Sequence, residues 1–210
     1  MLARCRLIAT ATWSDALDSL GIDGVMRGLP MRSGTGRVAG EAVTVREEVG
    51  DLGTYELTDF DVGGIIRATP PGAIAVVAMG GADVSTFGGL SARAGAQRGI
   101  AGIIIDGGCR DIEEIRAAGI YLASRHVTPR SGKYRIDVVA IGEPVTCGGV
   151  LVAHGDCVIA DETGVVVVPS ARIAETLSVA EKLDGNDRTF EGELSKGADF
   201  GTVAARLGHL

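Results

Sequence analysis

This chain has few aromatic residues and fewer positively than negatively charged ones. Aromatic residues make up 4% of 210 residues, and 20 lysines and arginines face 27 aspartates and glutamates, for a formal net charge of −7. Binding to nucleic acid or to an anionic membrane depends on clustered positive charge. The composition therefore argues against both as main partners. A small anionic substrate stays compatible with it, because one arginine and one metal ion can reverse the field locally.

Long apolar runs and paired cysteines are also missing. No window approaches the roughly 20 apolar residues of a membrane span, and residues 1–20 lack the apolar region of a signal peptide. The four cysteines form no CxxC pair, which is typical of isolated thiols in a reducing compartment. We therefore expect a cytoplasmic protein without disulfides. Cys109 stands next to Arg110, where a lowered thiol pKa is conceivable.

Glycine, by contrast, is abundant. The 32 glycines are about twice the usual share and predict many tight turns and close backbone approaches. A chain of 210 residues can bury a substantial core without cross-links. We expect one domain over residues 1–210, with a charged tail over residues 186–210.

The middle of the chain has the pattern of a parallel sheet. Apolar runs at residues 73–79 and 102–106 predict strands that are buried on both faces. Each is followed by a glycine-rich loop and then by a helical segment, at residues 91–97 and 111–118. A further strand is expected at residues 121–123. Strands alternating with helices predict an α/β fold with crossover helices.

The flanking segments predict helices at the N-terminal side and strands at the C-terminal side. Helices are expected at residues 12–20, 57–66 and 171–183, and strands at residues 40–45, 136–141, 157–161 and 164–169. Asp161 and Glu162 stand in the turn between the last two strands. We interpret this acidic pair as a solvated hairpin turn rather than a metal site.

Two loops carry the residues best suited to catalysis or ligand binding. The first, residues 87–91, opens a helix with Gly88, Gly89, Leu90 and Ser91, and N–H groups at a helix start suit a carboxylate or phosphate. A plain turn with a helix cap is the alternative, and it is the commoner one.

The second loop places Arg110 and Asp111 after two glycines that clear space for them. An ionised carboxylate there can hold Mg²⁺ or Mn²⁺, and the guanidinium can grip a substrate carboxylate in a fork. An ordinary N-cap by Asp111 is the alternative interpretation.

At this point the sequence resembles the RraA-like family. The segment GIAGIIIDGGCRD at residues 99–111 is similar to the family signature. Further similarity lies, in order, at residues 14–18, 40–45, 87–92 and 154–169, so that the resemblance covers about residues 12–185. The family includes 4-hydroxy-4-methyl-2-oxoglutarate aldolases that also decarboxylate oxaloacetate.

The resemblance implies a swivelling β/β/α domain that assembles as a homotrimer or a homohexamer. It implies that Asp111 ligates a divalent metal ion, Mg²⁺ or Mn²⁺, and that Arg110 binds the substrate. Gly88, Gly89, Leu90 and Ser91 would contact the substrate carboxylate through the backbone. The implied activity is that of a metal-dependent carbon–carbon lyase that forms the enolate of pyruvate from a small 2-oxo acid.

Two features bear on this expectation. Many aldolases of the family carry an acidic residue where this chain has Gly89, and the absence of that carboxylate weakens the orientation of water around the metal; nearby Asp83 or Glu114 could compensate. The family also contains regulators that bind ribonuclease E, and these generally lack the aspartate found here at Asp111. A non-catalytic regulator that binds such a protein partner is therefore the alternative hypothesis, as is a lyase or isomerase acting on an unrelated metabolite.

Overall fold

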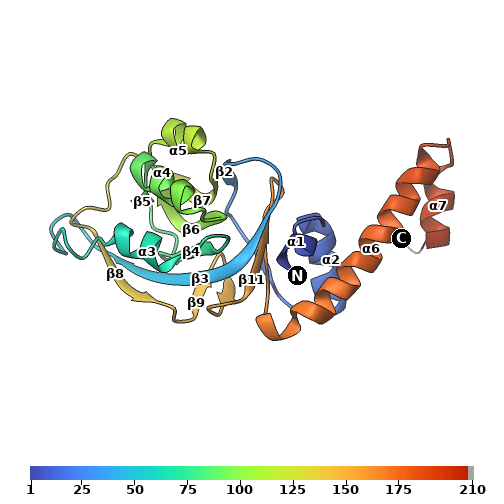
Figure 1. Ribbon diagram of the computed structural model, residues 1–210, viewed down its shortest axis with the longest axis horizontal. Coiled ribbons are helices and arrows are strands. Elements are labelled where there is room, and N and C mark those ends of the chain that lie inside the picture. The colour runs from blue at the N-terminus through green and yellow to red at the C-terminus, as the bar shows by residue number, and fades with distance from the viewer. Residues whose placement is uncertain (208–210) are drawn as a thin grey trace.

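One long strand organises the fold. The computed structural model describes residues 1–207, and strand β3 (Val38–Val49) runs through its centre (Figure 1). β3 pairs antiparallel with β11 (Cys157–Ala160), parallel with β4 (Ile74–Ala78) and antiparallel with β8 (Ile136–Ile141). Because β3 is 12 residues long, it joins a largely parallel half of the sheet to an antiparallel half.

The parallel half holds the predicted crossover units. β4, β6 (Gly102–Cys109) and β7 (Tyr121–Val127) are neighbouring parallel strands. Helices α4 (Gly89–Arg98) and α5 (Ile112–Ala118) connect them, short β5 (Ser85–Phe87) pairs with β6, and β2 (Met31–Ser33) adds to β7. All residues of β4 and β6 are buried, as their continuous apolar runs predict.

The antiparallel half contains the predicted hairpin of β11 and β12 (Val165–Val168), with β1 (Val25–Met26) at its edge. β9 (Val145–Cys147) and β10 (Val150–Val152) form a separate two-stranded sheet. The remaining helices are α1 (Leu2–Cys5), α2 (Thr10–Ser19), the 3-10 turn Ser170–Arg172, α6 (Ile173–Leu194) and α7 (Phe200–Leu207). α6 and α7 form an arm that projects from the body of the fold (Figure 1). The predicted α/β class, with a parallel core and a strand-rich C-terminal half, is confirmed.

The apolar core divides into three main clusters. The first lies beneath α3 (Val62–Ala68), α4 and α5 and includes Val77, Phe87 and Ile105. The second lies between the parallel strands and the β9–β10 sheet, and the third between β11–β12 and helices α1, α2 and α6. Within residues 1–207, none of the helices combines the length and the apolar character needed to cross a membrane.

Two predicted helices have different bounds in the structure. α3 begins at Val62, not at residue 57, because the side chain of Asp61 accepts a hydrogen bond from the N–H of Gly64 at 2.7 Å and so caps the helix there. α6 continues through Gly185 to Leu194, so part of the predicted tail belongs to a helix of 22 residues.

The turn at Asp161 is not solvated as predicted. Glu162 is exposed, but Asp161 is 8% exposed. Its carboxylate accepts hydrogen bonds from the N–H of Thr10 at 3.0 Å, the hydroxyl of Thr10 at 2.6 Å and the N–H of Thr163 at 2.9 Å. Asp161 therefore fixes the start of α2 to the hairpin.

We expect Asp161→Asn to destabilise the protein by about 1–3 kcal/mol at pH 7, because an amide cannot accept all of these hydrogen bonds. Desolvation raises the pKa of Asp161, but the hydrogen bonds from Thr10 and Thr163 outweigh it, so the pKa is lowered on folding. A lowered pKa stabilises the fold above the unfolded value of about 4, and this contribution is lost as the pH falls below it. Urea unfolding at pH 7 and near pH 3 measures the difference, with Glu162→Gln as control. An equal loss at both pH values would contradict the assignment.

Candidate functional site

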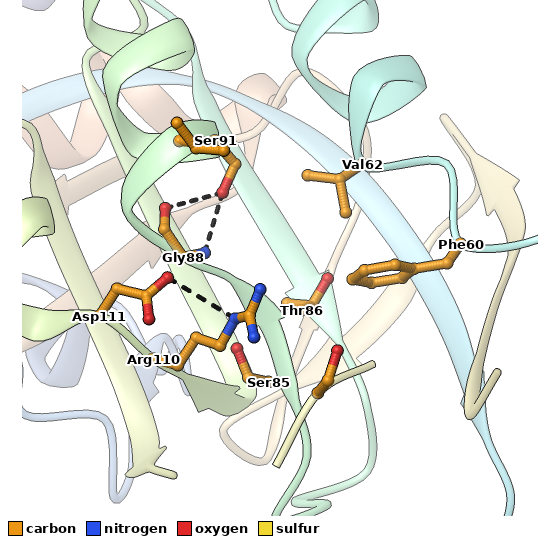
Figure 2. A pocket seen from close by; sticks show the side chains of 10 residues that line it. Phe60, Val62, Ser85, Thr86, Gly88, Ser91, Arg110 and Asp111 are labelled. Carbon is orange, nitrogen blue, oxygen red and sulfur yellow. Dashed lines mark hydrogen bonds and ion pairs between the residues drawn. The ribbon is translucent and has the colours of Figure 1, made fainter. Parts of the chain in front are cut away.

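The two predicted loops meet at one cavity of about 190 Å³ (Figure 2). β5 and β6 are parallel and pair Phe87 with Cys109, so the loops that follow them leave the sheet at the same edge. The N–H of Arg110 donates to the carbonyl of Phe87 at 2.9 Å. Ten residues line the cavity: Phe60, Val62, Ser85, Thr86, Gly88, Leu90, Ser91, Arg110, Asp111 and Ser131.

Asp111 occupies the N-cap position of α5 but does not act as a capping side chain. Its backbone is left-handed, with φ 54° and ψ 48°, and its side chain makes no capping hydrogen bond. Instead, Oδ2 accepts from the N–H of Gly89 at 3.2 Å and lies 3.6 Å from Nε of Arg110. A left-handed backbone costs a non-glycine residue roughly 1–2 kcal/mol. The side chain is 43% exposed, so this unfavourable conformation presents an accessible carboxylate to the cavity.

The guanidinium of Arg110 supplies positive charge beside that carboxylate. Its side chain is 39% exposed and reaches into the cavity from the end of β6 (Figure 2). A planar guanidinium with free N–H groups can bind a carboxylate through two parallel hydrogen bonds. The cavity therefore holds a hard anionic donor and an anion-binding group side by side.

The start of α4 forms the opposite wall. The hydroxyl of Ser91 accepts from the N–H of Gly88 and donates to its carbonyl, both at 2.9 Å. The N–H groups of Leu90 and Ser91 lie in the first helical turn, where a helix has no internal acceptor for them. Gly88, Leu90 and Ser91 line the same cavity as Arg110 and Asp111. The structure thus brings these five sequence-predicted residues to one cavity, whereas Gly89 is buried behind it and its N–H donates to Asp111.

Both glycines at this helix start lie in close contacts. A Cβ atom on Gly88 would lie 2.6 Å from Oδ2 of Asp111, and one on Gly89 would lie 2.5 Å from Cβ of Glu114. The stem of Glu114 therefore fills the space that a side chain at residue 89 would need. Neither of the two acidic residues considered as substitutes at this position, Asp83 and Glu114, lines the cavity, although the stem of Glu114 is adjacent to Gly89.

Gly107 and Gly108 do not clear space for the cavity as predicted. Both are buried within β6, which runs to Cys109. A Cβ atom on Gly107 would collide with the side chain of Met79, and one on Gly108 would lie 2.6 Å from the carbonyl oxygen of Val84. The two glycines let β6 pack closely against the segment that precedes β5.

Cys109 does not have the lowered pKa considered from the sequence. It is fully buried, its Sγ lies 3.3 Å from Oγ of Ser124, and burial raises the pKa of the thiol. The side chain does not line the cavity. The idea of a reactive thiol at this site is therefore wrong.

Sequence reasoning missed the other side of the cavity. Ser85 and Thr86 come just before the first motif and could have been found by extending it upstream across β5. Phe60, Val62 and Ser131 come from segments far away in the sequence, with no local signal that they meet the two loops.

The donor atoms fit a hard divalent ion that retains much of its water. Among residues 1–207, no group of three or more histidine, cysteine, aspartate or glutamate side chains could hold a metal ion. Asp111 is the carboxylate lining the cavity, and the four hydroxyl-bearing side chains that share the cavity, Ser85, Thr86, Ser91 and Ser131, each already take part in a hydrogen bond within the chain. Mg²⁺ and Mn²⁺ accept such sites, with one or two carboxylates and several waters.

Comparison with known proteins identifies a matching family and several related proteins. The family model described as RraA-like, Aldolase/RraA, matches residues 10–167. An uncharacterized protein of Methanocaldococcus jannaschii is 30% identical over 167 residues, which are 79% of this chain and 77% of the relative. A Thermus thermophilus protein named 4-hydroxy-4-methyl-2-oxoglutarate aldolase is 30% identical over 137 residues, 63% of this chain and 71% of the relative.

Solved structures agree with this result. An uncharacterized protein from Pseudomonas syringae pv. tomato superimposes with a TM-score of 0.86 at 30% identity, covering 96% of this chain and 95% of the other. Streptomyces coelicolor RraAS2, described as an unusual member of the RNase ES inhibitor RraA protein family, gives a TM-score of 0.79 at 27% identity. The superposition covers 90% of this chain and 96% of the RraAS2 chain.

Proposed function

Because the chain belongs to the RraA-like family, we propose that it is a divalent-metal-dependent carbon–carbon lyase acting on small anionic 2-oxo acids. The substrates we propose are oxaloacetate, by decarboxylation, and 4-hydroxy-2-oxo acids, by retro-aldol cleavage. The observation that carries this proposal is the carboxylate of Asp111. It is held in a left-handed backbone conformation, presented to a cavity and placed 3.6 Å from Nε of Arg110.

The size and charge of the cavity support a small acid as substrate. A volume of about 190 Å³ is below the range of roughly 300–1,000 Å³ typical of sites for drug-sized ligands. The Arg110 guanidinium and the N–H groups at the start of α4 converge on it. These donors suit the carboxylate of a 2-oxo acid, whereas Phe60 and Val62 present an apolar wall to its carbon chain.

Both reactions share one chemical requirement. When the carbon–carbon bond breaks, its electron pair remains on the pyruvate fragment, and negative charge develops on the keto oxygen. Arg110 lies where it can stabilise that charge and hold the substrate carboxylate in place. A Mg²⁺ or Mn²⁺ ion held by Asp111 would supply Lewis-acid stabilisation of the same oxygen. In decarboxylation the other product is carbon dioxide, so no base is needed to start the reaction.

The first experiment is to measure pyruvate release from oxaloacetate by metal-stripped protein, with and without added Mg²⁺ or Mn²⁺. The rate with free metal alone is subtracted, because free metal ions decarboxylate oxaloacetate. We expect release that requires both protein and metal. Release no faster than with free metal would refute decarboxylation and favour the regulator that binds a protein partner.

Assembly as a trimer or hexamer stays a prediction, which light scattering on the purified protein measures.

A further inference from the structure

A buried carboxyl group lies directly behind the cavity wall. Glu47 on β3 is 5% exposed and stands on the strand face that also carries Val45 and Val49. That face belongs to the apolar cluster that includes Phe60 and Val62, two of the residues that line the cavity. Glu47 is therefore an ionisable group in an apolar environment, next to the proposed site.

One side chain links Glu47 to the cavity. The hydroxyl of Thr86 lies 2.6 Å from Oε1 of Glu47, and Thr86 itself lines the cavity (Figure 2). Within the described part of the chain, Oε2 of Glu47 has no hydrogen-bond partner. An ionised carboxylate with one unsatisfied oxygen is costly in such a place. Burial raises the pKa of Glu47 to about 8, although the Thr86 hydrogen bond opposes the shift, so the group is protonated at neutral pH.

Charged neighbours do not explain this state. Arg46 and Glu48 alternate to the other face of β3, and Val138 of β8 stands opposite Glu47. The charged groups on the packed elements make contacts elsewhere: Arg46 with Glu48 and Glu143, Arg67 with Asp61, and Nη1 of Arg135 with the carbonyl of Ser131, while Asp137 lies opposite Glu48. The buried Nε of Arg135 has no hydrogen-bond partner among the described residues, and no charged group shifts the pKa of Glu47. Burial and the contact with Thr86 therefore govern the titration of Glu47.

We propose that Glu47 is a positioning residue that stores the proton which the Thr86 hydroxyl delivers into the cavity, to the enolate carbon of pyruvate. This inference rests on the lyase function proposed above and deepens it. Both lyase reactions leave an enolate that must gain a proton at carbon before pyruvate is complete. Arg110 lines the same cavity, but as a permanent cation it is not a proton donor.

The proton passes from Glu47 through Thr86 to the enolate carbon. The Thr86 hydroxyl donates to Oε1 when Glu47 is ionised; once Oε1 is protonated, the bond reverses and Glu47 donates to Oγ1 of Thr86, so the Thr86 O–H is free to point into the cavity. The O–H bond of Thr86 then breaks as a C–H bond forms on the enolate. The proton of Glu47 replaces the one that Thr86 has lost. Glu47 is left as a carboxylate, which takes up a proton from solvent after pyruvate leaves.

The test measures proton transfer separately from bond cleavage. In D₂O with Mg²⁺, a protein that forms the enolate exchanges the methyl protons of pyruvate for deuterium, which NMR follows directly. We expect Glu47→Gln and Thr86→Val each to slow this exchange on the order of 100-fold. Oxaloacetate consumption by Glu47→Gln, which does not line the cavity, needs no proton donor and should change less than about threefold. Glu48→Gln, on the other face of β3, is the control and should change neither rate.

The outcomes separate the inference from the lyase proposal. Loss of exchange with preserved consumption supports the stored proton. Parallel loss of both rates indicates a merely structural role, and unchanged exchange means that Glu47 takes no part in proton transfer. Either result overturns the stored-proton inference and leaves the lyase proposal standing. If the wild-type protein does not consume oxaloacetate, the lyase proposal itself fails, and proton delivery to pyruvate fails with it.

A second readout needs no activity. In protein labelled with ¹³C at the glutamate carboxyls, we expect one carboxyl signal to titrate near pH 8 and to be absent in Glu47→Gln. The wild-type exchange rate should rise as the pH rises through this value, because exchange begins with transfer of a methyl proton back through Thr86 to the ionised carboxylate of Glu47, and the variant should lose that dependence. A Glu47 that is ionised throughout the range from pH 5 to 9 would overturn the inference, whatever the substrate is.

Discussion

Replacement of Asp111 with asparagine is expected to lower metal-dependent pyruvate release from oxaloacetate by at least about 100-fold. Asparagine tolerates the left-handed backbone of this position, and its carbonyl oxygen can still accept the hydrogen bond from the N–H of Gly89. The substitution therefore removes the negative charge and little else. A divalent ion binds an amide oxygen far more weakly than a carboxylate, so the loss should appear as a higher metal requirement and a lower maximal rate.

The matched control is Glu113→Gln, in the first turn of the same helix. Glu113 is exposed and does not line the cavity, so its charge can be removed without changing the site. Release by this variant should stay within about twofold of wild type. Full activity of Asp111→Asn with an unchanged metal requirement would mean that the charge of Asp111 has no chemical task. That result would favour the interpretation as a regulator.

Substitution of Gly88 by alanine should reduce activity on the order of 10- to 100-fold without unfolding the protein. The backbone at Gly88, with φ −137° and ψ −168°, is open to alanine. The added Cβ would nevertheless lie 2.6 Å from Oδ2 of Asp111 and 3.3 Å from Nε of Arg110. The carboxylate must then move by the better part of an ångström, and a displacement of about 1 Å in a catalytic group can cost roughly 100-fold in rate.

Gly185→Ala serves as the control for a methyl group added to glycine. Gly185 lies within α6, and nothing is within 4 Å of the Cβ position. This variant should keep full activity, and a small rise in melting temperature is expected because alanine favours a helix. Thermal melting and pyruvate release are measured on both variants. If Gly88→Ala keeps wild-type activity, the close contact between Gly88 and Asp111 is not important for the reaction.

The elements that the sequence determined are those whose signal is local. The apolar runs of β4 and β6 specify strands buried on both faces, and the turn between β11 and β12 specifies a hairpin. The two glycine-containing loops mark the helix starts at Gly88 and Asp111, and parallel strands place such loops at one edge. Residues of the candidate site could therefore be named before any coordinates were known.

Tertiary structure decided what depends on contacts between distant segments. Asp161 was expected in solvent, but Thr10, 151 positions away, removes it from water through two hydrogen bonds. Glu47 has no neighbours in the sequence that reveal its burial, because Thr86 and the cluster around Phe60 come from other elements.

The direction of the Asp111 side chain was also beyond the sequence. An aspartate at a helix start ordinarily caps the helix, and the neighbouring sequence does not distinguish a capping aspartate from one that binds a metal ion. The left-handed backbone and the hydrogen bond from Gly89, 22 positions away, turn the carboxylate into the cavity instead. Residue type and spacing thus predicted the two loops of the candidate site, but not the residues of its other wall. Packing between β5 and β6 decided which way they point, since that direction depends on contacts made across the sheet.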